Sequence, residues 1–417
     1  MKKFLVTSAS LLALTVSTAA LADGHSNKIK IGVLATLEGT YTVLGEDGIR
    51  GLEVALKEAG GKAGGKEIET IIQSTDASPD SAVRGVKKLV EQDKVDIVIG
   101  PLSGSEGIAL RDYAKTQPQV TIINGISGAQ ETTFVDPAEN FFRFNMDGAQ
   151  WGAGLGEYVF KEKGWETVAT VAEDYSFAYT NFLGFALGYC NAGGKIVERQ
   201  WVPLGTKDFA SIIANLPDDV DAIYLGLGGG DAVNFLNQYQ QAGGDANLIG
   251  GTIMVDGTVL SSKGDAKNAL IGTPSSGPQA DDWDNPNWQK FVKAYQDAFP
   301  PEKRFPSPAL MATGYYNSTN AAMQCLNKTN GDLSDGQAAF RQCLGSLELD
   351  APNGKITLDN NRQAIGTNFV TEVVENADGT LGNKLMKVVE NVNQTLGVDE
   401  AEFKKLGLPS RDIVQCD

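Results

Sequence analysis

Short apolar runs alternate with segments of helical periodicity along the first third of the chain. Apolar positions between residues 49 and 59 recur every three or four residues, which is the spacing of one helix face. Similar periodicity predicts helices at 83–90 and 108–113. The strands expected around these helices are 30–35, 68–72, 95–100 and 120–124. Together they predict a first set of strand–helix units.

The same alternation restarts after the segment 141–144. Strands are expected at 168–171, 195–197, 222–225 and 248–250, with helices at 182–187, 209–213 and 233–239. Strands that alternate with helices form parallel sheets covered on both faces. Two such runs predict an α/β protein of two doubly wound parallel-sheet lobes rather than one very wide sheet.

The C-terminal third breaks the alternation. Helices are expected at 288–299, 308–325 and 337–347. The runs 368–374 and 385–392 then predict an antiparallel pair around the turn Asp378-Gly379. We expect these segments to return and complete the two lobes.

The N-terminus has the pattern of a secretory signal. Lys2 and Lys3 precede a mostly apolar run over 4–14, and the small-x-small pattern of a signal-peptidase site ends at Ala22. A first buried helix is the alternative for this segment. No later run approaches the roughly 20 apolar residues of a membrane helix. The sequence therefore predicts a signal peptide over 1–22 and a secreted chain without direct membrane insertion.

Charge and histidine content exclude several functions. The chain has 52 acidic and 35 basic residues, for a formal net charge of −17. Nucleic acid is not an expected partner, because phosphate backbones are held by clustered Lys and Arg. His25 is the single histidine, so a Ser-His-Asp triad or a His-rich zinc site would depend on that one residue. No enzyme activity, catalytic residue, metal ligand or cofactor is predicted.

Four cysteines in a secreted chain favour disulfides. Cys325 and Cys343 are 18 residues apart on successive predicted helices, so we favour their pairing. Cys190 then remains to bind Cys416 near the C-terminus. Free buried thiols are the alternative.

Ligands of doubly wound sheets bind beyond the carboxyl ends of the strands, so the loops after the strands are the candidate site. The loop after the first strand contains Tyr41 and Leu44, which could form an apolar pocket wall or simply cover the lobe. The loop after 95–100 places Ser103, Gly104 and Ser105 at a helix start, where exposed N–H groups favour an anion. A plain N-cap, with Glu106 in the first turn, is the alternative.

Two further loops complete the candidate set. Gly125 and Ser127 lie in a second turn rich in hydrogen-bond donors, a near miss to a nucleophile elbow that lacks a histidine base. Tyr175 and Phe177 follow a strand of the second set, where clustered aromatics suit either a binding cleft or the core. The glycine-rich segments 60–66 and 226–231 depart from the phosphate-loop and dinucleotide patterns.

The order of these motifs resembles a known family. The signal sequence, Lys30-Ile31-Gly32-Val33 leading to Gly39-Thr40-Tyr41, Val98-Ile99-Gly100-Pro101-Leu102-Ser103 and Glu173-Asp174-Tyr175 are similar to type I periplasmic solute-binding proteins of branched-chain amino acid ABC importers. The resemblance implies a periplasmic, monomeric protein whose lobes are joined by three crossovers. The expected lobes are 23–145 with 276–355 and 146–275 with 356–417. It also implies closure over a small ligand and docking onto a membrane permease.

The resemblance also implies a pocket. In the family, a carboxylate is held at positions that match Ser103, Gly104 and Ser105, and the next loop matches Gly125 and Ser127. A family tyrosine aligns with Gly228, and a family aromatic aligns with Leu44. The acid that pairs with a ligand ammonium aligns near Ile253, so Asp256 could replace it only after a shift of about three residues.

A buried ammonium without a carboxylate partner costs several kcal/mol. We therefore expect a small carboxylate ligand, either a branched-chain or hydrophobic amino acid or an aromatic or hydrophobic organic acid that lacks an ammonium. A sensory receptor of the same fold is the alternative to transport. A secreted hydrolase is the enzyme alternative.

Overall fold

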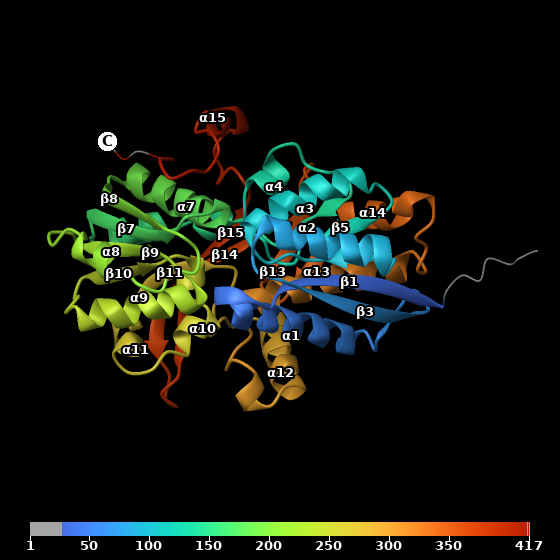
Figure 1. The fold of residues 1–417 in the computed structure, drawn as a ribbon, viewed down its shortest axis with the longest axis horizontal. Coiled ribbons are helices and arrows are strands. Elements are labelled where there is room, and N and C mark those ends of the chain that lie inside the picture. The colour runs from blue at the N-terminus through green and yellow to red at the C-terminus, as the bar shows by residue number, and fades with distance from the viewer. Residues whose placement is uncertain (1–26, 415, 417) are drawn as a thin grey trace, which may run out of the picture.

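The computed structural model describes residues 27–414 and 416, and Figure 1 shows two α/β halves side by side. A six-stranded sheet lies in one half and a nine-stranded sheet in the other. The predicted two-lobe architecture with parallel sheets is therefore confirmed. The predicted signal peptide and His25 lie outside the described residues.

The six-stranded sheet has the order β2-β3-β1-β4-β5-β6. Its strands are β1 (Lys28–Thr36), β2 (Lys62–Ala63), β3 (Lys66–Thr75), β4 (Ile97–Ile99), β5 (Thr121–Ile123) and β6 (Phe141–Phe142). The associated helices are α1 (Thr42–Glu58), α2 (Pro79–Lys87), α3 (Gly104–Thr116) and α4 (Glu131–Phe134). Because β1 pairs in parallel with both β3 and β4, the strand order reverses between β1 and β4. Loops that follow strands at such a reversal form the crevice where ligands bind.

The nine-stranded sheet also contains a reversal of strand order. Its order is β12-β13-β14-β11-β10-β9-β7-β8, with β15 beside β14. The parallel strands are β7 (Thr167–Glu173), β8 (Lys195–Val202), β9 (Ala222–Gly226), β10 (Asn247–Gly250) and β11 (Pro274–Gly277). The antiparallel strands are β12 (Leu349–Ala351), β13 (Gly354–Leu358), β14 (Ala364–Glu375) and β15 (Leu381–Val392). Here the order reverses between β7 and β9.

Helices of this half and of the connections complete the chain. They are α5 (Gly148–Trp151), α6 (Leu155–Tyr158), α7 (Ser176–Ala192), α8 (Ala210–Ala214), α9 (Gly229–Gln241), α10 (Gly257–Leu260), α11 (Asp265–Leu270), α12 (Pro286–Ala298), α13 (Leu310–Lys328), α14 (Ala338–Gly345) and α15 (Glu400–Lys404). Short 3-10 turns span Gly39–Tyr41, Thr252–Val255, Pro301–Lys303 and Asp335–Gln337, and π turns span Lys88–Gln92 and Val159–Lys163.

The helix α13 lies in the half of the six-stranded sheet, although it follows the second half in the sequence. It packs so closely on α1 that a Cβ on Gly51 would lie 2.0 Å from the carbonyl oxygen of Ala312. The chain therefore passes between the halves after β6, again after β11, and a third time between α14 and β14, where β12 and β13 form the edge of the nine-stranded sheet (Figure 1).

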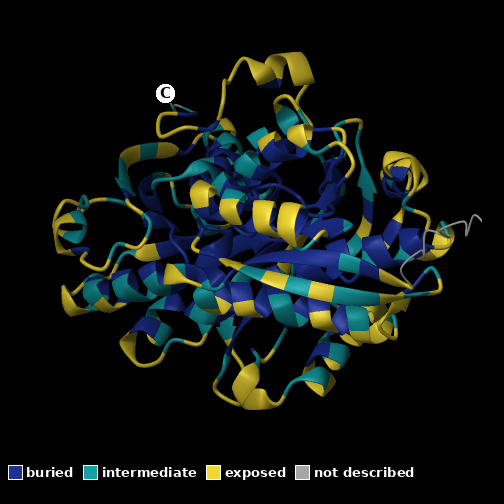
Figure 2. Cartoon of the chain, turned by 45° about the vertical axis from the view of Figure 1, so that its right-hand side comes forward, coloured by how far each residue is buried: buried dark blue, intermediate teal, exposed yellow. Residues whose placement is uncertain are grey.

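The central strands of both sheets, such as β1, β4, β7 and β9, are buried, whereas β3 and β15 are partly exposed. Figure 2 shows the buried strands in dark blue inside the molecule. The Cα atoms of Cys325 and Cys343 are 5.6 Å apart, and those of Cys190 and Cys416 are 5.1 Å apart. Both pairs lie at disulfide distance, in the pairing that the sequence favours. None of the helices in the described residues is long and apolar enough to cross a membrane.

Candidate functional site

A small cavity lies between the two halves, where the strand order of each sheet reverses. It is lined by Tyr41, Leu44, Leu102, Ser103, Gly104, Ile126, Gly128, Trp151, Tyr175, Phe177, Ile253, Leu310 and Met311. Its volume is about 20 Å³, which holds one or two water molecules. Six of the residues predicted as candidates line it: Tyr41, Leu44, Ser103, Gly104, Tyr175 and Phe177.

Aromatic rings form much of the cavity wall. The ring centroids of Tyr175 lie 6.4 Å from Tyr41 and 6.0 Å from Phe177, and Phe177 lies 5.8 Å from Trp151. Tyr41 comes from the first half and Tyr175 from the second, so the wall crosses the gap between them. Ring faces and edges at these separations suit a flat apolar ligand.

The N-termini of four long helices converge on the cavity. Its lining includes the N-cap or the first turn of α1, α3, α7 and α13. The N-cap Tyr175 makes no side-chain hydrogen bond to the first amides of α7. Free N–H groups and helix dipoles favour an anion at such ends. None of the lining residues that the structure describes carries a charge.

Ser103 lines the cavity, as expected for an anion site, and is also the N-cap of α3, which was the alternative. Its hydroxyl donates to the carbonyl of Ala77 at 2.7 Å and accepts from the backbone N–H of Glu106. The Glu106 carboxylate in turn accepts from the backbone N–H of Ser103 at 2.9 Å, which completes a capping box. Burial raises the pKa of Glu106 to about 7. Ser103 therefore lines the cavity as an N-cap, with its own hydrogen-bonding groups already engaged.

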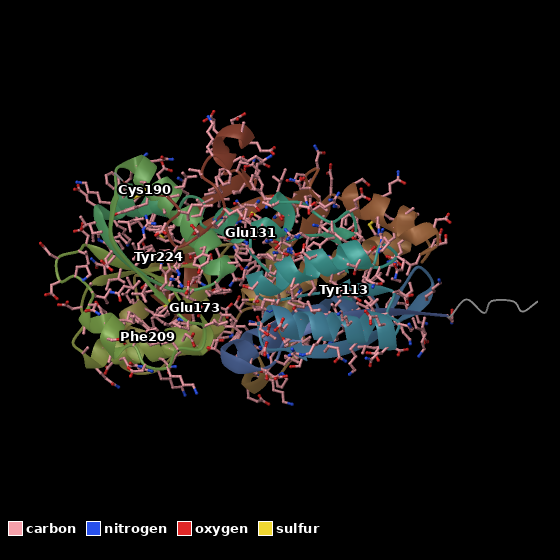
Figure 3. All side chains as sticks on the ribbon, turned by 45° about the horizontal axis from the view of Figure 1, so that its top comes forward. Tyr113, Glu131, Glu173, Cys190, Phe209 and Tyr224 are labelled. Carbon is pink, nitrogen blue, oxygen red and sulfur yellow. A yellow bond between two sulfur atoms is a disulfide. The ribbon has the colours of Figure 1, made fainter. Side chains whose placement is uncertain are left out.

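A hydrogen-bond network joins the halves beside the cavity. The Tyr41 hydroxyl is hydrogen-bonded to Glu173 and lies 3.0 Å from the Tyr175 hydroxyl. The backbone N–H of Gly228 donates to the other oxygen of Glu173 at 3.1 Å. Figure 3 labels Glu173 close to the junction of the halves. Ser105 adds a contact of 3.1 Å between its hydroxyl and that of Ser176.

The other five candidate residues, Ser105 among them, do not line the cavity. Ser127 donates its hydroxyl to Asn124 at 2.6 Å, and Gly125 packs against the ring of Tyr315. Gly228 packs against Ile253 and donates to Glu173. Asp256 is the N-cap of α10 and lines a different recess from the cavity.

Sequence reasoning missed several residues of the site. Leu310 and Met311 begin α13, which no strand directly precedes, and Trp151 lies in the first connection between the halves. Loops after strands gave no signal for these three positions. Glu173 could have been found from the sequence, because it is an acidic residue at the end of the apolar strand β7.

Two buried carboxylates, one from each half, are close enough for the charge of one to affect the other. Asp47 of α1 accepts from the Tyr295 hydroxyl at 2.5 Å and from Arg50 Nε at 3.1 Å. Asp256 Oδ1 accepts from the backbone N–H of Thr258 at 3.4 Å, while Oδ2 has no hydrogen-bond partner among residues 27–414 and 416. Burial and the nearby charge of Asp47 raise the pKa of Asp256 to about 8.

We expect Asp256→Asn to remove one source of pH-dependent stability. The folded pKa of about 8 lies above the unfolded value, so the native protein holds a proton that the unfolded chain has released. Between about pH 5 and 7 this group lowers the free energy of unfolding by about 1.4 kcal/mol per pH unit. The variant's gain over the wild type should grow by that amount per unit in urea unfolding.

Asp221→Asn is the matched control. Hydrogen bonds from Thr167 hold the pKa of Asp221 below its usual value, so its ionisation does not change between pH 5 and 7. Its stability difference from the wild type should stay constant over that range. A constant difference for Asp256→Asn would contradict an ionisable buried carboxyl at this position.

Comparisons with known proteins agree with the two-lobe fold. A family model described as "Periplasmic binding protein" matches residues 28–380. The Leu/Ile/Val-binding protein homolog 6 of Brucella melitensis is 24% identical over 387 residues, covering 91% of this chain and 96% of that protein.

Two solved structures extend the match to three dimensions. A solute-binding protein of an ABC transporter from Rhodopseudomonas palustris BisB5, in complex with 3,4-dihydroxybenzoic acid, is 25% identical with a TM-score of 0.80. It covers 88% of this chain and 99% of that one. A substrate-binding protein of an ABC transporter from Sphaerobacter thermophilus is 27% identical with a TM-score of 0.78, with the same coverage. This chain therefore belongs to the type I periplasmic binding proteins of the branched-chain amino acid family.

Proposed function

We propose that this protein is the periplasmic solute-binding component of an ABC importer and captures a small aromatic or other hydrophobic carboxylate between its lobes. One observation carries the proposal. A cavity walled by aromatic and aliphatic side chains is also the point on which the N-termini of four long helices converge. Such a site combines apolar contacts for a ring with a field that favours an anion.

Neutral donors would hold the carboxylate. The net charge of −17 repels an anion at long range, and no charged side chain lines the described cavity. Gly104 and Ser105 occupy the first turn of α3, whose first N–H groups have no partner within the helix. A carboxylate that accepts backbone N–H bonds at a helix N-terminus needs no cation.

An α-amino acid fits this site less well. Its ammonium would need a carboxylate partner, because a buried unpaired cation costs several kcal/mol. Asp256, the candidate partner, caps α10 and lines a different recess. Glu173 is buried and hydrogen-bonded to the Tyr41 hydroxyl, and it is not part of the cavity wall.

The closed cavity must expand to admit a ring. Its volume of about 20 Å³ is smaller than the volume of any aromatic acid. The lining belongs to both halves, so a small separation of the lobes enlarges it. Met311 adds a flexible side chain that can adjust to the ligand. We therefore propose opening and closing of the lobes 23–145 with 276–355 against 146–275 with 356–417.

The family and the predicted signal peptide both support a role in transport. The solute-binding protein of Rhodopseudomonas palustris belongs to an ABC transporter and is bound to 3,4-dihydroxybenzoic acid. A secreted binding protein of this kind would deliver its ligand to a membrane permease. Similarity to the Leu/Ile/Val-binding protein homolog 6 of Brucella melitensis keeps branched-chain amino acids as the ligands to compare.

A thermal-shift screen followed by calorimetric titration tests the proposal. A ligand at 100 times its Kd stabilises the folded protein by about 2.7 kcal/mol, enough to raise Tm by several degrees. We expect benzoate or 3,4-dihydroxybenzoate to raise Tm, and leucine and isoleucine to have little effect. A larger shift with leucine than with either acid would contradict the ligand class, and no shift with any of them would contradict the function.

A further inference from the structure

We propose that Glu173 is a positioning residue that determines ligand specificity: it holds a proton in the closed lobes and so makes the Tyr175 hydroxyl a donor to an anionic ligand. The network of Glu173, Tyr41 and Tyr175 beside the cavity is the basis of this proposal. It rests on the proposed function, because it requires a carboxylate ligand between the lobes.

Glu173 is the last residue of β7 and is fully buried. Its side chain is 0% exposed, and its two oxygens contact different parts of the molecule. One accepts from the backbone N–H of Gly228 at 3.1 Å, and the other is hydrogen-bonded to the hydroxyl of Tyr41. Tyr41 belongs to the first half, so this bond forms only when the halves are together.

The charged groups around this network do not neutralise an ionised Glu173. Asp231 on α9 is close enough to raise the pKa of Glu173, and Glu106 on α3 acts on Tyr175 in the same direction. Asp174, the next residue, is paired with Arg411. Burial is the largest cause of the raised pKa of Glu173. A carboxyl that is buried beside other carboxylates and lacks a cation holds its proton.

The proton sets the direction of the hydrogen-bond chain. A protonated Glu173 donates to the Tyr41 oxygen, and Tyr41 donates to the Tyr175 oxygen 3.0 Å away. The O–H of Tyr175 is then free to donate to a ligand oxygen. An ionised Glu173 would reverse the chain, so that Tyr175 donates to Tyr41 and keeps only lone pairs for a ligand. The neutral acid therefore favours anionic ligands, and the ionised form would favour ligands that donate.

Calorimetric titration of benzoate in two buffers of different ionisation enthalpy tests the proposal between pH 6 and 8. In the open lobes Glu173 lacks its bond to Tyr41 and is ionised, so closure over benzoate should take up one proton from the buffer. Affinity should then fall by up to about tenfold per pH unit. Glu173→Gln imitates the neutral acid, because its amide can donate to Tyr41 and accept from Gly228. Benzoate binding to Glu173→Gln should take up about one proton fewer than binding to the wild type. Its affinity at pH 6 should stay within about threefold, and at pH 8 should exceed that of the wild type.

Three further variants separate this role from general structure. Tyr175→Phe removes the final donor and should weaken benzoate binding by about tenfold or more, in line with a hydrogen bond to a charged group. Asp256→Asn should retain the Glu173 contribution to proton uptake. Glu166→Gln, at an exposed position before the same strand, should behave as the wild type.

The outcomes distinguish the two proposals. Equal proton uptake in the wild type and Glu173→Gln would overturn the role of Glu173 while leaving the binding function intact. Loss of benzoate affinity in Glu173→Gln at pH 6 would also overturn it, because the neutral side chain would not have replaced the acid. If neither benzoate nor 3,4-dihydroxybenzoate bound to the wild type at any of these pH values, both proposals would fail.

Discussion

Gly104→Val should weaken ligand binding by about 10- to 100-fold while leaving the fold of each lobe intact. A Cβ on Gly104 would lie 2.9 Å from the Cβ of Phe177 and 3.0 Å from its backbone nitrogen, and Phe177 belongs to the opposite lobe. Overpacking of this kind costs about 1–3 kcal/mol, and each 1.4 kcal/mol changes affinity about tenfold. The two closest contacts, both with Phe177, exist only when the lobes close. The open form keeps only the milder contact of 3.1 Å with the Cβ of Ala129, which belongs to the same half as Gly104.

Gly107→Val is the matched variant on the same helix. Its Cβ would lie 2.1 Å from the Ser127 hydroxyl, and both residues belong to the first half. That clash persists whether the lobes are open or closed. Gly107→Val should therefore lower the midpoint of urea unfolding, while Gly104→Val should lower it far less.

Calorimetry with benzoate and urea unfolding of both variants measure the two effects. Small-angle scattering should in addition show that benzoate fails to compact Gly104→Val. An affinity for benzoate equal to that of the wild type would mean that the Gly104–Phe177 contact is not part of the closed, ligand-bound form.

The alternation of strands and helices is what the sequence predicts best, because most of the parallel strands are short apolar runs. The expected strand at 30–35 is the centre of β1, and 248–250 falls within β10. The strand β11 escaped detection because its sequence, Pro274–Gly277, has no apolar pattern. It pairs with β14 through backbone bonds, which side-chain periodicity does not report.

Part of the cavity also follows from the sequence. Loops after β1, β4 and β7 were expected to form the site, and Tyr41, Ser103 and Tyr175 line it. These loops meet because parallel strands end at the same edge of a sheet. Leu310 was not expected there, since it reaches the cavity only through the return of α13 to the first half.

Buried charge was the harder part to predict. Arg143 stands among three phenylalanines in the segment that separates the two strand–helix sets, and the sequence alone marks only a boundary there. The structure shows why an arginine occupies an apolar segment: it is 0% exposed and joins the first connection between the lobes to the third.

Arg143→Met should lower the free energy of unfolding by about 3–5 kcal/mol, the range for removing one partner from a buried ion pair. The guanidinium donates to the carbonyl of Ala129 at 2.7 Å, to the Thr133 hydroxyl at 2.5 Å and to the side chain of Gln363. Asp147 lies 4.0 Å away and is also 0% exposed. Methionine fills much of the volume but removes all of these donors. The Gln363 oxygen then keeps only the Thr133 hydroxyl, and Thr133 keeps only the Gln394 amide.

The double variant Arg143→Met/Asp147→Asn separates the lost ion pair from the lost hydrogen bonds. Asp147 keeps its hydrogen bonds from the Gln150 backbone and the Gln394 side chain, so in Arg143→Met it becomes a buried charge without a cation. If the ion pair dominates, Asp147→Asn should recover part of the stability in the Arg143→Met background and lower it in the wild-type background. Urea unfolding of the four proteins measures this coupling. A loss below about 1 kcal/mol in Arg143→Met would mean that the network does not hold the connections together. A large loss with no coupling would assign the effect to the carbonyl and hydroxyl acceptors alone.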